Sequence, residues 1–256
     1  MLALLHPHPR DASITFDPGP HKYTITRAEE DVHSNYVSVT TWNHSHFPTF
    51  DPDAVLAKMN LLNPKSPYFG QTKDEIKAGW ETNRQTAAAL GTAMHAQIED
   101  FYNNGGSVKT TTTTTTKEMQ LFYDFVRAYP HLKPYRSEWM IFHEEWRLAG
   151  AVDMVFQNTN DGTFAIYDWK RSKSIQKTNA FNQWALTECI AHLPDANYWH
   201  YALQLNTYKA ILEAKYGLLI SELCLVVLHP NQTRFLVQKV PVLAVEMQEL
   251  LYAKTH

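Results

Sequence analysis

The chain has 256 residues, of which 44% are hydrophobic, so it can build one large domain or two small ones around a core. Its 23 lysines and arginines stand against 26 aspartates and glutamates, and the net charge of 23 − 26 = −3 shows no basic excess of the kind common in nucleic-acid binders. The two cysteines, Cys189 and Cys224, form no CxxC pair, which excludes a cysteine-ligated iron–sulfur cluster and disfavours structural zinc.

The sequence predicts neither a signal peptide nor a membrane-spanning helix. Residues 1–10 contain a short apolar patch broken by two His-Pro pairs, and they lack the basic start of a signal peptide. The apolar stretch Leu218–Leu228 is interrupted by Ser221 and Glu222. We therefore expect a soluble intracellular protein that does not enter a membrane.

The N-terminal third predicts short strands followed by helices. Pro18-Gly19-Pro20 is typical of a hairpin turn, Asp51 of a helix start, and Thr72 with Glu75 of a capping box. In chain order we expect a hairpin at Phe16–Ile25, a strand at Tyr36–Thr41, a helix at Val55–Met59 and a helix that begins at Thr72.

The rest of the chain predicts two helices, three strands, a helix and two strands. The threonine run Thr110–Thr116 predicts a surface loop and carries no assigned chemistry. The elements are helices at Thr86–Asn103 and Lys117–Tyr129, strands at Glu138–Trp146, Gly150–Phe156 and Phe164–Lys170, a helix at Tyr198–Tyr216, and strands at Leu223–Leu228 and Arg234–Val240. This order predicts an α/β or α+β fold with a mixed sheet flanked by helices. We expect one domain over residues 1–256, with an N-terminal extension (1–84) and a core (85–240).

Two of the predicted strands carry charged residues at positions that ought to be buried. Side chains alternate along a strand, so Asp168 and Lys170 project on the same side. If Gly150–Phe156 pairs with that strand through the turn at Asn158–Gly162, Asp153 approaches Asp168. Charges on apolar strands are costly unless something compensates, and a hard divalent cation such as Mg²⁺ or Mn²⁺ suits these oxygen ligands. Lysine beside such an ion can orient water or hold developing charge.

Two helices add polar pairs of suitable spacing. His95 lies in the helix Thr86–Asn103 with Glu99 one turn beyond, and an imidazole is a ligand that favours Mn²⁺ beside Mg²⁺. Gln204 and Tyr208 are one turn apart in the later helix. The segment Ile166–Lys177 is also locally basic, since Lys170, Arg171, Lys173 and Lys177 against Asp168 give 4 − 1 = +3, which suits a DNA backbone.

Taken together, these motifs resemble the PD-(D/E)XK nuclease superfamily and its RecB-like exonuclease branch. The matching segments are Gly91–His95 (GTAMH), the strand from Glu138, Gly150–Asp153 (GAVD), Asp168–Lys170 (DWK) and Gln204–Tyr208 (QLNTY). They cover about Gly91–Tyr208, nearly half of the chain. Tyr36–Thr41 also resembles a short N-terminal motif of the mitochondrial genome-maintenance exonucleases.

The resemblance implies a restriction-endonuclease-like core and a metal-dependent DNA exonuclease acting on single-stranded or free-ended DNA in replication, repair or recombination. It implies Asp153, Asp168 and Lys170 as catalytic residues, and His95, Asp153 and Asp168 as Mg²⁺ or Mn²⁺ ligands. Glu138, Gln204, Tyr208 and Arg171 would support the site or bind DNA. Unlike the CRISPR-associated and helicase-fused relatives with four cluster cysteines, this chain has no iron–sulfur cluster, and a helicase or replication partner would act in trans.

Several alternatives remain open on the residues alone. Asp168 and Lys170 also suit a solvated charge pair on an edge strand, Glu99 suits a helix surface, and Glu138 suits a strand end. A structure-specific or restriction-type endonuclease, or a non-catalytic DNA-binding protein of the same fold, would carry similar motifs. Loss of a carboxylate or of the lysine would mark the non-catalytic protein, and neither is missing.

Overall fold

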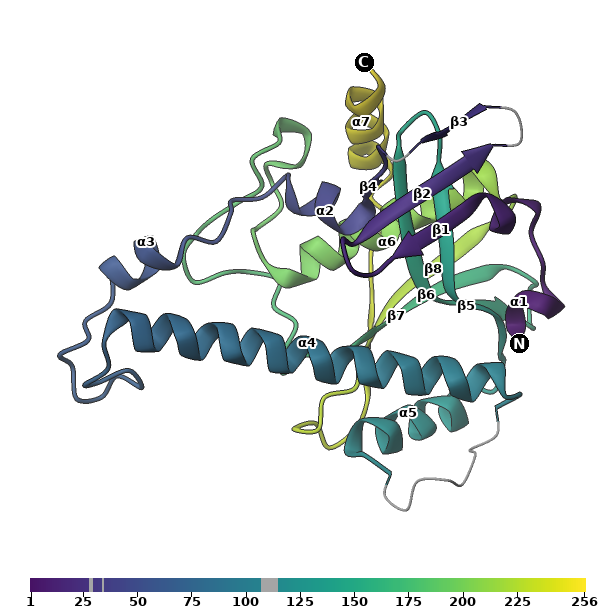
Figure 1. Ribbon diagram of the computed structural model, residues 1–256. Coiled ribbons are helices and arrows are strands. Elements are labelled where there is room, and N and C mark those ends of the chain that lie inside the picture. The colour runs from purple at the N-terminus through teal and green to yellow at the C-terminus, as the bar shows by residue number, and fades with distance from the viewer. Residues whose placement is uncertain (28–29, 34, 107–114) are drawn as a thin grey trace.

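The computed structural model describes residues 1–27, 30–33, 35–106 and 115–256. Its centre is a six-stranded mixed sheet with the order β4-β6-β7-β8-β9, in which β5 also pairs with β6 (Figure 1). The β4–β6 and β7–β8 pairs are parallel and the other pairs antiparallel. The strands are β4 (Val37–Ser38), β5 (Leu132–His143), β6 (Leu148–Asn158), β7 (Phe164–Lys170), β8 (Ile220–Val227) and β9 (Leu236–Lys239).

Helices cover both faces of this sheet, as the sequence predicts. One buried cluster joins the sheet to α4 and α5, and another joins it to α6 and α7. Among the described residues, no helix is both long enough and apolar enough to cross a lipid bilayer. The helices are α1 (Leu2–Leu5), α2 (Val39–His44), α3 (Pro52–Ala57), α4 (Lys73–Asn103), α5 (Lys117–Ala128), α6 (Asn197–Lys215) and α7 (Ala244–Thr255), with 3₁₀ turns η1 (Pro9–Ser13) and η2 (Glu188–Ile190).

A small antiparallel sheet of β1 (Ile14–Asp17), β2 (Lys22–Arg27) and β3 (Glu30–His33) lies beside the main sheet. The predicted hairpin is confirmed, with Phe16 opposite Tyr23. Apolar side chains of β1 and β2 pack against Phe142 and Ala149 of the main sheet. This contact attaches the N-terminal residues to β5 and β6, the strands that carry much of the candidate site.

The predicted strand at Tyr36–Thr41 is wrong beyond its first residues. Only Val37 and Ser38 pair with β6, and the chain then enters α2. The cause is local, because the Ser38 hydroxyl accepts a hydrogen bond from the Thr41 backbone N–H at 3.0 Å and caps the helix. Beta-branched residues favour strands only weakly, so the cap and packing on α6 prevail.

Other differences concern the extent of helices. The helices expected from Thr72 and over Thr86–Asn103 are one continuous helix, α4, with the predicted capping box at its start. Helix α7 was not predicted, although its buried Met247, Leu250 and Leu251 have helical spacing. Of the threonine run, residues 110–114 lie outside the described residues, and the Thr116 hydroxyl caps α5.

Residues 48–90 project from the rest of the molecule and are called the arm (Figure 1). Within it, α3 packs near the start of α4, where Lys77 pairs with Asp53 at 2.5 Å and the Phe50 and Trp80 rings lie 5.9 Å apart. Residues 81–90 of α4 are exposed on every face. A helix this exposed has few packing partners of its own, which leaves it free to contact a ligand.

Gly150 of β6 lies against the Tyr208 ring of α6. A Cβ atom at Gly150 would come within 2.7 Å of Tyr208 Cε1. We predict that Gly150→Ala lowers the free energy of unfolding by about 1–3 kcal/mol, because this overpacking must displace the ring or the strand. Urea denaturation measures the change.

Gly79→Ala is the matched control, because a Cβ there meets nothing within 4 Å. In an exposed helix this exchange should raise the free energy of unfolding by up to about 1 kcal/mol. If Gly150→Ala proved as stable as wild type, the close approach of β6 to α6 would be wrong.

Candidate active site

The register of β6 and β7 brings Asp153 and Asp168 together. The two strands pair antiparallel from Gln157 opposite Phe164 to Met154 opposite Tyr167. One further step in this register sets Asp153 against Asp168, and Asp153 Oδ2 accepts a hydrogen bond from the Trp169 backbone N–H at 2.9 Å. The predicted antiparallel pairing of the two strands is therefore confirmed.

Alternation along β7 orients Asp168 and Lys170 toward α6. Tyr167 and Trp169 pack in the cluster with α4 and α5, whereas Ile166 packs in the cluster with α6. Lys170 Nζ lies 2.6 Å from Asp168 Oδ2 and 4.4 Å from the centre of the Tyr201 ring of α6. Tyr201 was missed in the sequence, although its spacing of three and seven residues from Gln204 and Tyr208 puts it on their side of the helix.

Burial shapes the protonation of these groups. Burial, and then the charge of Asp153, raises the pKa of Asp168 to about 6. Burial also raises the pKa of Asp153, against the opposing effect of His95 and Lys170. Burial lowers the pKa of Lys170, but the carboxylates of Asp168 and Asp153 outweigh it and hold that pKa above its ordinary value. Lys170 is therefore an ammonium, which donates hydrogen bonds and does not act as a base.

His95 reaches the carboxylates from α4. Its Nε2 lies 2.9 Å from the Trp169 carbonyl oxygen, and its Nδ1 lies 3.4 Å from Glu138 Oε1 and 3.6 Å from Asp153 Oδ2. Burial lowers the pKa of His95, but the charges of Asp153, Glu138 and Asp168 outweigh it and raise the pKa to about 9. In this state an imidazolium occupies the position between the carboxylates and balances their charge.

Glu138 joins the site with an unusual backbone. It lies between two pairs of the β5–β6 ladder, Ser137 with Met154 and Trp139 with Val152, so the register puts it opposite Asp153. Its φ of 44° is in the left-handed region, which costs a non-glycine residue about 1–3 kcal/mol. Strain of this kind persists only where the surroundings enforce it, and it often accompanies function.

Asp11 of η1 bonds side chains on both sides of Glu138. Its carboxylate accepts hydrogen bonds from Arg136 Nη1 at 2.7 Å and from Trp139 Nε1 at 2.9 Å. Burial raises the pKa of Asp11, but these two bonds and one from the His8 backbone outweigh it and lower the pKa. No sequence signal marks Asp11, because it acts across 125 residues of chain.

Five charged side chains thus converge and are called the charged cluster: His95, Glu138, Asp153, Asp168 and Lys170. Within it, ligand atoms of His95, Glu138 and Asp153 all lie within 4.8 Å of one another. Asp168 is outside this closest set. Of the expected ligand trio, His95 and Asp153 are in this closest set, and Glu138 stands there where Asp168 was expected.

Gln204 and Tyr208 border the cluster from α6. Gln204 Nε2 donates to the Tyr208 hydroxyl at 3.1 Å. Tyr208 is buried, and burial raises its pKa well above the ordinary value, with the charges of Asp153 and Asp168 adding to the shift. The phenol therefore keeps its proton.

Two other residues have partners outside the cluster. Arg171 pairs with Glu118 of α5 at 2.7 Å, and both side chains are largely buried. Glu99 accepts a hydrogen bond from Asn103, one turn farther along α4, at 3.4 Å. Arg171 thus ties the end of β7 to α5 and does not face the charged cluster.

The cluster's donor set fits a hard divalent cation. Asp168 Oδ2 is buried, and the Lys170 ammonium lies 2.6 Å from it. Three carboxylates against the two cations of His95 and Lys170 give a net charge of 2 − 3 = −1, and loss of the His95 proton would make it −2. Carboxylate oxygens, a carbonyl oxygen and one imidazole are ligands that Mn²⁺ and Mg²⁺ accept.

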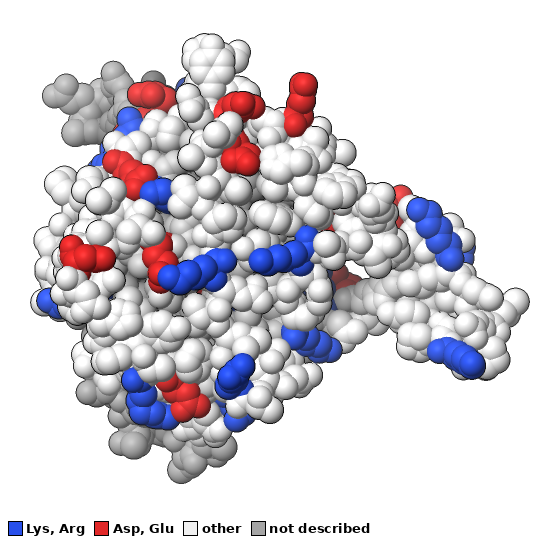
Figure 2. Space-filling model, turned by 180° about the vertical axis from the view of Figure 1, so that it is seen from behind, with Lys and Arg blue, Asp and Glu red and all other residues white. Residues whose placement is uncertain are grey.

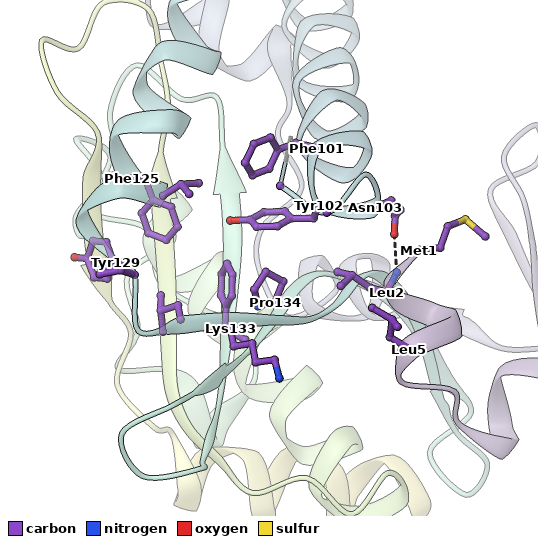
Figure 3. A pocket seen from close by; sticks show the side chains of 16 residues that line it. Met1, Leu2, Leu5, Phe101, Tyr102, Asn103, Phe125, Tyr129, Lys133 and Pro134 are labelled. Carbon is purple, nitrogen blue, oxygen red and sulfur yellow. Dashed lines mark hydrogen bonds between the residues drawn. The ribbon is translucent and has the colours of Figure 1, made fainter. Parts of the chain in front are cut away.

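A cavity of about 440 Å³ lies at the C-terminal ends of α4 and α5 beside α1 (Figure 3). Apolar side chains such as Phe101, Tyr102 and Phe125 line it, and Lys133 is its one charged lining residue. A wall of this kind offers no pair of groups for acid–base or metal chemistry. The candidate active site is therefore the charged cluster and not this cavity.

The pKa of His95 predicts a pH-dependent stability without added metal. Because its folded-state pKa of about 9 exceeds the unfolded value of 6.5, its stabilising contribution is complete below pH 6.5 and is lost as the pH rises through about 9. In EDTA, wild type should exceed His95→Gln in free energy of unfolding at pH 6 and lose most of that advantage by pH 9.5. A difference that stays constant across this range, measured by urea denaturation, would contradict the charge network.

Comparison with known proteins adds no family. The chain matches no family model, and it matches no curated protein in sequence. The functional evidence is therefore the set of side chains that converge where β6 and β7 meet α4 and α6.

Proposed function

We propose that the protein is a divalent-metal-dependent deoxyribonuclease with a restriction-endonuclease-like core of the PD-(D/E)XK type. The observation that carries the proposal is the convergence of the charged cluster from four elements, α4, β5, β6 and β7, onto the end of β7. Gathering five ionisable groups in a largely buried site opposes stability unless they serve a ligand, since the groups lose much of their contact with water. Strongly perturbed, clustered groups of this kind are typical of functional sites.

His95, Asp153, Asp168 and the Trp169 carbonyl oxygen would hold the metal ion, with Glu138 beside them. When bound, the ion polarises a phosphoryl oxygen, lowers the pKa of an attacking water and neutralises the leaving oxygen. The protein supplies the rest by position. The 2.9 Å bond from the Trp169 N–H fixes Asp153 Oδ2, and the strained backbone of Glu138 directs its carboxylate to the same place.

Lys170 is suited to hold negative charge on a phosphodiester. It is buried, is kept protonated by two carboxylates and is held over the Tyr201 ring. A preorganised ammonium in a water-poor site stabilises charge that develops in the transition state, and it needs no reorganisation during the reaction. Gln204 and Tyr208 add an amide and a protonated phenol on the same side, both able to donate to a phosphate oxygen.

Two features favour a DNA strand as the substrate. The arm carries a stretch of helix exposed on every face, which leads into the part of α4 that bears His95. From behind, acidic side chains gather mostly at the upper end, while lysines and arginines lie mostly across the middle and lower part and on the arm (Figure 2). Lysine and arginine contacts to phosphates supply most nonspecific affinity for DNA.

Removal of the lysine tests the proposal. We predict that wild type degrades labelled linear single-stranded DNA with Mn²⁺ and that Lys170→Met lowers the rate at least about 100-fold, because a preorganised charge donor is lost. Lys133→Met is the matched control, since that lysine is exposed on β5 and outside the cluster. It should keep close to wild-type activity.

Wild type that degrades no DNA with any divalent metal, or Lys170→Met that degrades it as fast as wild type, would contradict the proposal. Mn²⁺ titration calorimetry on Asp153→Asn tests the ligand assignment without any turnover. A closed circular substrate separates the two modes of cleavage, because an exonuclease leaves it intact.

A further inference from the structure

A second hollow lies between the arm and the core. It is a cavity of about 410 Å³, called the arm pocket, lined on one side by arm residues from Pro48 to Lys58 and on the other by Phe181, Gln183, Asp195 and His200. The arm side includes α3, and the core side includes the chain before α6 and its first turn. Nothing in the charged cluster lines this pocket.

The pocket offers two flat apolar rings to solvent. Phe50 on the arm is 66% exposed and Phe181 on the core side is 64% exposed. Large aromatic side chains are usually well buried, so two exposed phenyl rings lining one cavity suggest a ligand with a flat face. The ring of His200, which also lines the pocket, stacks on Phe47 with centroids 4.0 Å apart.

The polar groups of the pocket suit the edge of a heterocyclic ring. His200 Nε2 pairs with Asp195 at 2.7 Å, which fixes the imidazole and leaves Nδ1 for a ligand. The Gln183 side-chain amide has no hydrogen-bond partner among the described residues. The Asp51 carboxylate is occupied, because it caps α3 by accepting from two backbone N–H groups at 2.9 and 3.1 Å.

Helix α6 connects the pocket to the charged cluster. His200, Gln204 and Tyr208 follow at intervals of four residues, so they lie along one side of the helix. At about 1.5 Å of rise per residue, His200 is roughly 6 Å from Gln204 and 12 Å from Tyr208 along the axis. A DNA strand whose phosphate lies at the cluster would reach the pocket within a few nucleotides.

We propose that the arm pocket binds one unstacked nucleobase of a single-stranded DNA substrate, between Phe50 and Phe181, with His200 and Gln183 at the base edge. This inference rests on the proposed nuclease function and adds that the bound strand of the substrate is unpaired. A base within a duplex has both faces covered by its neighbours, so only an unpaired strand presents a face to the phenyl rings. The arm pocket then binds a base of the DNA strand, while the charged cluster acts on the phosphate backbone of the same strand.

The test measures binding of a fluorescein-labelled oligothymidylate in EDTA, so that no cleavage occurs. Phe181→Ala should raise Kd at least about fivefold, because a stacking platform is lost. Leu186→Ala is the matched control, since Leu186 is 67% exposed in the same segment but does not line the pocket. It should leave Kd unchanged, and Phe181→Trp should restore binding with quenched indole fluorescence.

An abasic oligonucleotide of the same length separates base contacts from backbone contacts. Wild type and Phe181→Ala should bind it equally, and wild type should bind it more weakly than oligothymidylate. Equal Kd values for Phe181→Ala and wild type on oligothymidylate would overturn the pocket while leaving Mn²⁺-dependent cleavage by wild type intact. If wild type neither binds nor cleaves DNA, the nuclease proposal fails and the pocket assignment with it.

Discussion

Electrostatic repulsion between Asp153 and Asp168, buried on neighbouring strands, is the constraint on which the rest of the site depends. Burial and mutual repulsion raise the pKa of Asp168 to about 6. The ionised form of this carboxyl group is therefore one that a nearby cation would stabilise. Lys170 and His95 balance part of that charge from opposite sides. Moving charged side chains from water into a buried cluster rarely stabilises a protein. Such a cluster is therefore expected where a ligand requires it.

The surrounding elements explain how such a cluster is held. Asp11 bonds the side chains of Arg136 and Trp139, which flank Glu138, and Gly150 admits the Tyr208 ring where any side chain would collide. The small N-terminal sheet therefore has a structural link to β5, and α6 approaches β6 closely. The same helix then continues to the arm pocket, so one rigid element spans both the chemical and the base-binding parts of the proposed site.

Much of the cluster was predictable because it follows from local rules. Alternation puts Asp168 and Lys170 on one side of a strand, and the short turn at Asn158–Gly162 makes β6 its antiparallel neighbour. Apolar spacing likewise indicates α4 and α6. The left-handed backbone of Glu138 and its restraint by Asp11 were not predictable, since they arise from contacts across 125 residues. The arm pocket has the same origin, because its two walls are distant in sequence.

The most direct measurement is anomalous diffraction from a crystal soaked with Mn²⁺. The account predicts one anomalous peak within roughly 2.0–2.4 Å of a His95 nitrogen and of oxygens from Asp153 and Asp168, the range of typical ligand distances. Lys170 should lie beside that peak without coordinating it. A crystal that binds Mn²⁺ only at other surfaces, with the charged cluster unchanged, would contradict the account.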